Sequence, residues 1–203
     1  MAEPTTNDWL NIAKGYFEKT QFPNTVGAIN GKHIRIECPK SSESDCNVFK
    51  TSTFGKKLYG DKLNFPPEQC LPNDEFGSPQ VTTIFVLVTD EAFALHNNLL
   101  RPFPGRTLND KRRIFNYRSS RARQYIECTF GIMSKKWPVF QTNILVEPDA
   151  AVIITKGSSF MESVQRRGVG NIQKNAKDVR EYFVEYVNNP NHALDWQNTI
   201  IGR

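Results

Sequence analysis

The stretch TTIFVLVTDEAF, residues 82–93, decides how this chain folds. The apolar residues Ile84 to Val88 follow one another without an intervening polar residue. An uninterrupted run of β-forming residues is typical of a central strand covered on both faces. The strand ends at Asp90 and Glu91, and in open α/β sheets ligands bind beyond the carboxyl ends of the strands. Asp90 is therefore the first candidate site residue.

Extended and helical patterns alternate on both sides of this strand. Residues 7–19, 108–136 and 175–188 have helical apolar periodicity, and a shorter helical pattern runs through Val48, Phe49, Phe54 and Leu58. We expect the first helix to be capped by Asn7 or Asp8, and residues 60–80, rich in glycine and proline, to form a loop. Extended segments are expected at 97–105 and 140–148, whereas 149–155 fits helix or strand. Strands that alternate with helices predict an α/β sheet.

Residues 26–37, VGAINGKHIRIE, allow two interpretations. The Asn30-Gly31 pair between β-forming residues favours a hairpin with a type I′ turn, because both residues tolerate positive φ angles. A continuous strand running through His33 and Ile36 is the alternative.

Length and composition indicate one domain. The chain has 203 residues, 23% of them charged, and no apolar run approaches the roughly 20 residues that span a bilayer. The start lacks the basic and apolar regions of a signal peptide, so we expect an intracellular protein. Four cysteines without a C-x-x-C pair give little support for zinc and are expected to be reduced.

The net charge of +5 is unevenly distributed. The segment from Arg101 to Lys136 contains ten basic and two acidic residues, so its net charge is +8 and that of the rest of the chain is about −3. Such a basic block predicts binding to a polyanion, most simply nucleic acid. A basic helix face exposed to solvent is the alternative. The expected nucleic-acid-binding bases are Lys111, Arg112, Arg113, Arg118, Arg121, Arg123, Lys135 and Lys136.

Two acids suit phosphodiester chemistry. Hydrolysis of a phosphodiester by two Mg²⁺ or Mn²⁺ ions requires carboxylates that lie close in space. Asp90 qualifies as a strand-end acid, and Glu127 lies at the border of the apolar stripe of the 108–136 helix. Each has a structural alternative: Asp90 as a helix N-cap, and Glu127 as an ion pair with Arg123.

Four blocks of the sequence, in order, resemble the PIF/Harbinger transposases and the nucleases derived from them. These are FPNTVGAINGKHIRIECP (22–39), VTDEAFAL (88–95), FNYRSSRARQYIECTFGIMSKKWPVF (115–140) and VREYFVEYVNNPNHALDWQ (179–197). The resemblance implies an RNase H-like α/β core, with a mixed sheet flanked by helices, that cuts DNA with divalent metals, Mg²⁺ or Mn²⁺. Its three acids correspond to Asn30, Asp90 and Glu127 of this chain. The resemblance also favours the continuous strand through His33 and Ile36 over a hairpin at Asn30-Gly31.

The first of these positions departs from the family pattern, because it is an amide instead of a carboxylate. Asn30 retains an oxygen ligand but supplies no negative charge, so we expect weak metal binding and impaired cleavage. A second departure is that PKSSESDCNVF joins the first strand directly to the next helix, where the family has a second and a third strand. We therefore expect a single domain, residues 1–203, with a leading helix (1–24), a core remnant (25–140) and a C-terminal helical part (141–203).

The resemblance also guides expectations about partners. We expect DNA as the partner, a protein partner that supplies sequence-specific DNA binding, no membrane association, and a location in the nucleus as well as the cytoplasm. Two alternatives remain open beside the impaired nuclease. One is a non-catalytic nucleic-acid-binding or protein-binding module that uses the basic helix, and the other is a non-functional truncated product.

Overall fold

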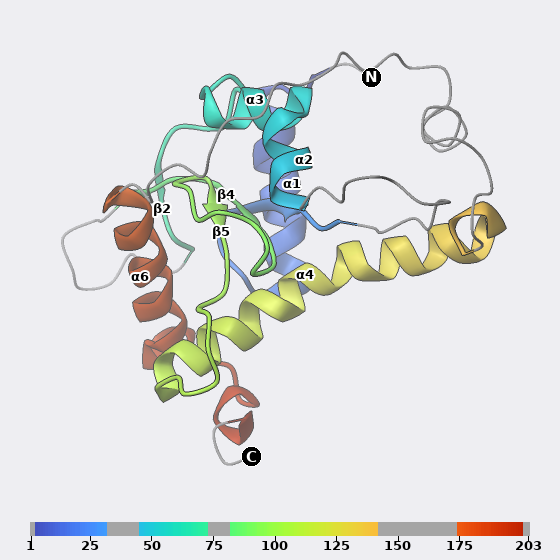
Figure 1. The fold of residues 1–203 in the computed structure, drawn as a ribbon. Helices are drawn as coiled ribbons and strands as arrows, with labels where there is room; N and C mark the ends of the chain where they lie inside the picture. Colours follow the sequence, from blue (N-terminus) through green and yellow to red (C-terminus); the bar gives the residue numbers. More distant parts are fainter. Residues whose placement is uncertain (1–2, 32–44, 73–81, 142–173, 201–203) are drawn as a thin grey trace.

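The computed structural model describes residues 3–31, 45–72, 82–141 and 174–200 (Figure 1). Several expectations lie outside these ranges: the continuation of the first strand through His33, the extended segment after Thr142, and the segment at 149–155.

The central sheet has three parallel strands in the order β1-β4-β5. They are β1 (Thr25–Ala28), β4 (Val86–Val88) and β5 (Leu99–Leu100). A separate antiparallel pair is formed by β2 (Gln69–Cys70) and β3 (Thr82–Thr83), inside and beside the segment expected to be a loop. The expected α/β class is confirmed, and the central strand is the one predicted from residues 84–88.

The predicted helices are present, with two corrections. They are α1 (Thr6–Thr20), α2 (Asp45–Thr51), α3 (Thr53–Tyr59), α4 (Asp110–Lys136) and α6 (Lys174–Asn188). Thr5 caps α1 instead of Asn7 or Asp8, and it forms a capping box with the Asp8 carboxylate. The short helical pattern is divided at Ser52, whose hydroxyl caps α3. Three 3₁₀ turns, η1 (Pro138–Phe140), η2 (Pro190–His192) and η3 (Gln197–Ile200), follow the longer helices.

The two faces of β4 are buried in two different clusters. Val86 and Val88 point to one side and pack among residues of α4 and α6, such as Phe115 and Phe183. Leu87 points to the other side and packs with Trp9 and Ala13 of α1, and with Leu58 of α3. Because side chains alternate across a strand, an uninterrupted apolar run is what burial on both faces requires.

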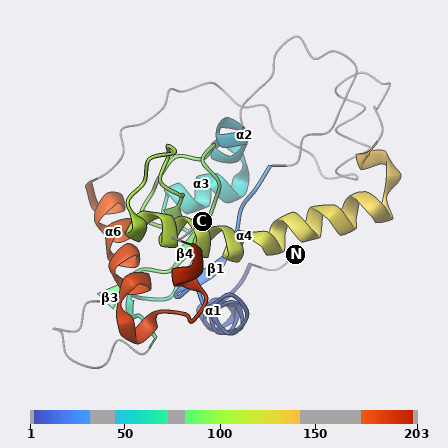
Figure 2. The ribbon, with the colours of Figure 1, turned by 90° about the horizontal axis from the view of Figure 1, so that it is seen from below.

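Helix α4 is buried only in its N-terminal half. With one exception, Ser134, its buried residues lie between Ile114 and Ala122, whereas Ile132 is 68% exposed and Trp137 is 50% exposed. Figures 1 and 2 show the C-terminal half extending away from the other described elements. No described helix combines the length and apolar character that crossing a lipid bilayer requires.

Arg118 connects α4 to three other segments of the chain. Its guanidinium is 2% exposed and donates to the backbone carbonyls of Gln21, Val187 and His192, as well as to the side-chain oxygen of Gln197. Burial lowers the pKa of Arg118 to about 10. Arg118 is therefore a structural residue that holds the end of α1 and the segment after α6 against α4.

We predict that Arg118→Leu destabilises the protein by about 3 kcal/mol, because it leaves several buried carbonyls without a donor. Urea unfolding followed by circular dichroism measures this change. Lys14→Leu, on the exposed side of α1, removes the same charge and is expected to change the free energy of unfolding by less than about 0.5 kcal/mol. Equal effects of the two substitutions would contradict the structural role of Arg118.

Candidate functional site

The register of the parallel sheet places Asn30 beside Asp90. Ala28 pairs with Val88, and the Ile29 amide donates to the Val88 carbonyl at 2.9 Å. Asn30 and Asp90 each lie two residues beyond this pair, so both leave the carboxyl edge of the sheet from adjacent strands. The strand interpretation is therefore confirmed for residues 26–28, but β1 ends at Ala28 and residues 29–31 continue without strand pairing beyond the Ile29 amide.

A bulge in β1 sets this register. The pairing shifts between Thr25 and Gly27, and Gly27 has a φ of 154°. A Cβ atom at Gly27 would lie 3.3 Å from Leu87 Cδ2. Glycine therefore allows both the positive φ angle of the bulge and the close approach of β1 to Leu87 of β4. Asn30 is not among the described residues with positive φ. This excludes a type I′ turn at Asn30-Gly31, because that turn requires positive φ at both central positions.

Both side chains at this edge bond to nearby backbone amides. The Asn30 Oδ1 accepts from the Gly31 amide at 2.9 Å, and the Asp90 Oδ1 accepts from the Ala92 amide at 2.9 Å. The alternative for Asp90, a capping role, is thus partly realised, although residues 91–93 form a turn instead of a helix. Each side chain keeps further acceptor capacity, since amide and carboxylate oxygens carry more than one lone pair.

Glu127 lies on α4, the helix that contacts both β1 and β4. Its carboxylate forms an ion pair with Arg123 at 3.2 Å, and its side chain is 47% exposed. This is the i, i+4 pair that was the structural alternative for Glu127. Because the surface ion pair is weak, worth only a few tenths of a kcal/mol, it leaves the carboxylate easily displaced.

The donor set does not fit a pair of divalent metals. In the part of the chain that the structure describes, no three residues among histidine, cysteine, aspartate and glutamate are grouped as metal ligands. One neutral amide and one carboxylate meet at the strand edge, and the second carboxylate is paired with an arginine. Two dications close together repel one another, and a single carboxylate neutralises little of that repulsion.

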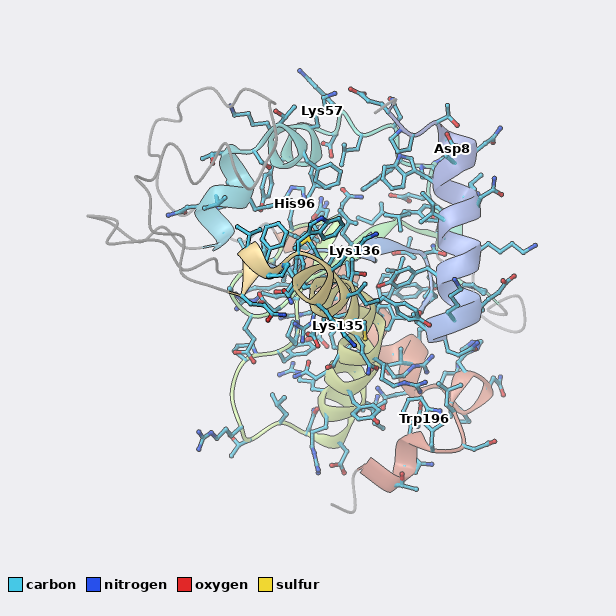
Figure 3. The ribbon with its side chains drawn as sticks, turned by 90° about the vertical axis from the view of Figure 1, so that its right-hand side faces the viewer. Asp8, Lys57, His96, Lys135, Lys136 and Trp196 are labelled. Carbon is cyan, nitrogen blue, oxygen red and sulfur yellow. The ribbon has the colours of Figure 1, made fainter. Side chains whose placement is uncertain are left out.

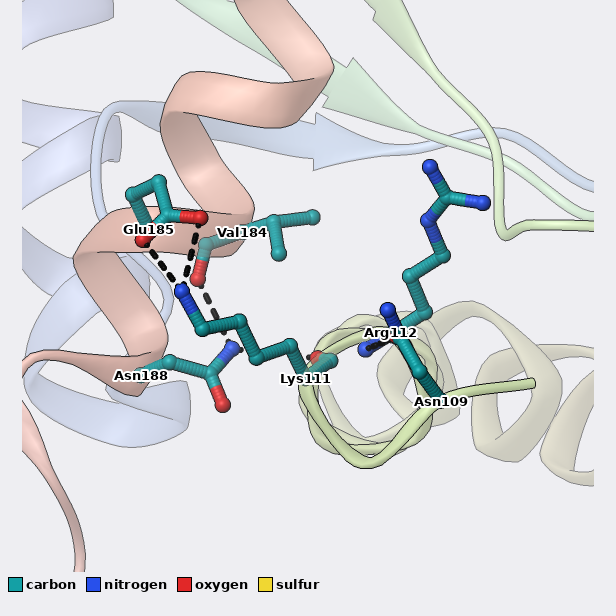
Figure 4. A network of polar contacts seen from close by, with 6 residues as sticks. All are labelled: Asn109, Lys111, Arg112, Val184, Glu185 and Asn188. Atoms are coloured by element: carbon teal, nitrogen blue, oxygen red, sulfur yellow. Dashed lines mark hydrogen bonds and ion pairs between the residues drawn. The ribbon is translucent and has the colours of Figure 1, made fainter.

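Acids of α6 neutralise the N-terminal part of the basic block. Lys111 Nζ lies 2.8 Å from Glu185 (Figure 4). An Arg112 nitrogen lies 3.0 Å from Glu181. Asn188 adds bonds to the Lys111 and Val184 carbonyls. The sequence carries a signal for this arrangement, because Glu181 and Glu185 are four residues apart and so share one face of the predicted helix.

The eight predicted nucleic-acid-binding bases therefore differ in whether their side chains are free to contact a phosphate. Arg118 is removed from the set, because a guanidinium that is 2% exposed and bonded to carbonyls cannot also reach a phosphate. Arg113 lies 3.5 Å from Asp110 and Arg121 stacks on Trp196. Lys135 and Lys136 are exposed at the end of α4 that faces the viewer in Figure 3.

The described cysteines Cys46, Cys70 and Cys128 are free thiols. This agrees with the expectation of reduced cysteines for three of the four.

Comparison with known families identifies the class of protein. The sequence model of the DDE superfamily endonucleases matches residues 26–158, which is more than half of the chain. The match includes Asn30, Asp90 and Glu127. The chain belongs to the DDE superfamily endonuclease family. No curated protein and no solved structure matched it.

We predict that Asn30→Asp lowers the free energy of unfolding by about 1 kcal/mol in the absence of divalent ions, because two adjacent carboxylates then repel one another. Added Mn²⁺ should raise the melting temperature of this variant, since an ion bound only by the folded protein stabilises it. Thermal melts with and without Mn²⁺ measure both effects. The double variant Asn30→Asp/Asp90→Asn is the control, and a Mn²⁺ response equal to that of the single variant would show that the two positions do not form one site.

Proposed function

We propose that the chain is a Harbinger-type, transposase-derived DNA endonuclease domain in which divalent-metal-dependent cleavage of phosphodiesters is impaired. The observation that carries the proposal is the β1–β4 register, which makes Asn30 and Asp90 neighbours at the carboxyl edge of the sheet. Membership of the DDE endonuclease family supports the reaction class and DNA as the substrate. The four ordered sequence blocks support the Harbinger subfamily and an RNase H-like core.

The identity of residue 30 is the reason for the impairment. The amide of Asn30 and the carboxylate of Asp90 together carry one negative charge, where a pair of aspartates would carry two. Cleavage assisted by two metal ions needs carboxylates that bind both ions and hold them close together. Mg²⁺ and Mn²⁺ should therefore bind weakly, if at all.

The short connection after β1 is a second reason. Of the described strands, only β4 pairs with β1, so β1 is an edge strand within this described part of the sheet. Additional strands next to β1 would hold the site more rigidly, and sites supported by rigid elements position their ligands more accurately. We include the absence of the second and third strands of the family in this proposal.

We predict that the wild-type protein nicks supercoiled plasmid DNA very slowly with Mg²⁺ or Mn²⁺, and that Asn30→Asp raises the rate at least about tenfold, which corresponds to roughly 1.4 kcal/mol of barrier. Gel electrophoresis of the plasmid over time gives the rate. Peptide mass analysis of the segment around Asn30 excludes deamidation, which would convert part of the wild type into the variant.

The activity gained by Asn30→Asp must depend on the other acids. Adding Asp90→Asn or Glu127→Gln to the variant should abolish the gain, whereas adding Glu18→Gln, on the exposed face of α1, should leave it intact. A gain that survives the loss of Asp90, or rapid nicking by the wild type, would contradict the proposal.

A second function, nucleic-acid binding without cleavage, is favoured by the exposed end of α4. Lys135 and Lys136 lie there beside the exposed ring of Trp137, over which the Lys136 ammonium lies at 5.2 Å from the centroid. Cations next to an exposed aromatic ring are typical of surfaces that bind nucleic acids. With this function we propose a nuclear as well as cytoplasmic location, and a separate protein partner that selects the DNA sequence.

We predict that a Lys135→Gln/Lys136→Gln variant binds a short DNA duplex more weakly and that the slope of log affinity against log salt falls by about two, because two phosphate contacts are lost. Fluorescence anisotropy over a range of salt concentrations measures the slope. The control, Lys56→Gln/Lys57→Gln on α3, removes the same charge far along the chain from α4. Equal slopes for the two double variants would count against binding at the end of α4.

A further inference from the structure

Two guanidinium groups lie against one buried aromatic ring. Phe103 is 4% exposed, and its centroid lies 3.8 Å from the Arg180 Cζ and 4.5 Å from the Arg112 Cζ. The two arginines come from different helices, α6 and α4, which pack against each other. Stacking on a shared ring fixes the positions of the two side chains before any ligand binds, and stacking leaves the in-plane N–H donors free to bond.

A third arginine, Arg101, links this pair to the turn that follows Asp90. Arg101 follows β5, and the Leu100 carbonyl accepts from the Thr89 amide at 2.8 Å. Its guanidinium donates to the Phe93 carbonyl at 3.2 Å and approaches the Glu91 carbonyl at 3.4 Å. Arg101 therefore leaves the same edge of the sheet as Asp90, one strand further along.

Positive charge exceeds negative charge at this point. We call Arg101, Arg112 and Arg180 the arginine cluster; its one ion-pair partner among the described residues is Glu181, which pairs with Arg112. Burial, together with the charges of Arg101 and Arg112 and against the opposing charge of Glu181, lowers the pKa of Arg180 to about 10. Because the three positive charges repel one another, an anion bound between them would be stabilised.

Donors in the arginine cluster remain unused. The Nε atoms of Arg101 and Arg180 are buried and have no hydrogen-bond partner among the described residues. Buried polar groups in proteins are almost always bonded, so each such group requires an explanation. The Arg112 side chain is 43% exposed, so the arginine cluster is open to solvent on one side. A ligand with several acceptor oxygens could bond there to donors from three separate elements.

We propose that the arginine cluster is an anion subsite that holds a phosphate group of the nucleic-acid backbone next to Asp90. Phosphate oxygens match the planar fork of a guanidinium, and one phosphate can accept from two or three arginines at once. The assignment to nucleic acid, as opposed to free phosphate, rests on the proposed function. The subsite would position the strand at the sheet edge and does not require that cleavage occurs there.

The test measures binding of a fluorescein-labelled DNA duplex to the full chain by anisotropy, in EDTA so that divalent metals take no part. Arg101→Gln and Arg180→Gln should each weaken binding about tenfold, and each should reduce the salt slope by about one. The weakening should be the same for unrelated duplex sequences, because phosphates carry no sequence information. Lys14→Gln removes one exposed positive charge from α1 and should change neither quantity measurably.

A conservative variant separates charge from folding. Arg180→Lys keeps the positive charge and should retain the salt slope of the wild type, whereas its affinity falls because lysine lacks the planar fork. Thermal melts establish whether each variant is folded. If Arg180→Gln does not fold, Arg101→Gln and Arg180→Lys still decide the question. The proposal would be overturned if Arg101→Gln had the same affinity and salt slope as Lys14→Gln and if Arg180→Lys had the same affinity as Lys14→Gln.

Competition with inorganic phosphate is the last measurement. Inorganic phosphate should compete with the duplex only at high concentration, because it makes a single set of contacts. Saturable binding of inorganic phosphate by a protein that does not bind the duplex would overturn the assignment to nucleic acid. Failure of Asn30→Asp to nick DNA would leave these binding results unchanged, so the nuclease proposal and the phosphate subsite can fail separately.

Discussion

The parallel pairing of β1 with β4 is the constraint on which the rest of the candidate site depends. The two strands are separated by almost sixty residues in the chain, and only their register brings Asn30 next to Asp90. Gly27 makes this register accessible, because its positive φ and missing side chain allow the bulge and the close contact with Leu87. A shift of one residue in this pairing would turn the side chain of Asn30 to the opposite face of the sheet from that of Asp90.

The same edge of the sheet contains groups of opposite charge on neighbouring strands. Asp90 follows β4, and Arg101, whose charge acts on Arg180, follows β5. This arrangement suits the proposed ligand, a nucleic acid, because one backbone phosphate can bind the arginines while a neighbouring phosphodiester lies beside Asp90. With an amide at residue 30, Asn30 and Asp90 together supply one negative charge, whereas the arginine cluster supplies three positive charges. Weak metal binding is therefore our prediction for this member of the DDE endonucleases.

Much of the fold follows from local patterns. The uninterrupted apolar run at 84–88 predicted a strand covered on both faces, and the helical periodicities predicted α1, α4 and α6 to within a few residues. One error, the cap of α1, and one rejected alternative, the hairpin, lie where local signals compete. Thr5 caps α1 because the capping box with Asp8 satisfies two groups at once, and the Asn30-Gly31 pair forms no type I′ turn because β1 already pairs with a distant strand. Long-range strand pairing outweighed the preference of two residues.

The sequence by itself determined the residue types at the site, including the amide at position 30, and the charge of each segment. Only the tertiary structure decided which charges are available. Arg118 was indistinguishable from its basic neighbours along the helix, yet it is buried and bonded to carbonyls of distant segments. Arg112 and Arg180, from different helices, stack on the ring of Phe103. The reason is physical: a charge is fixed by covalent chemistry, whereas its partners and its exposure depend on how α4, α6 and the sheet pack together.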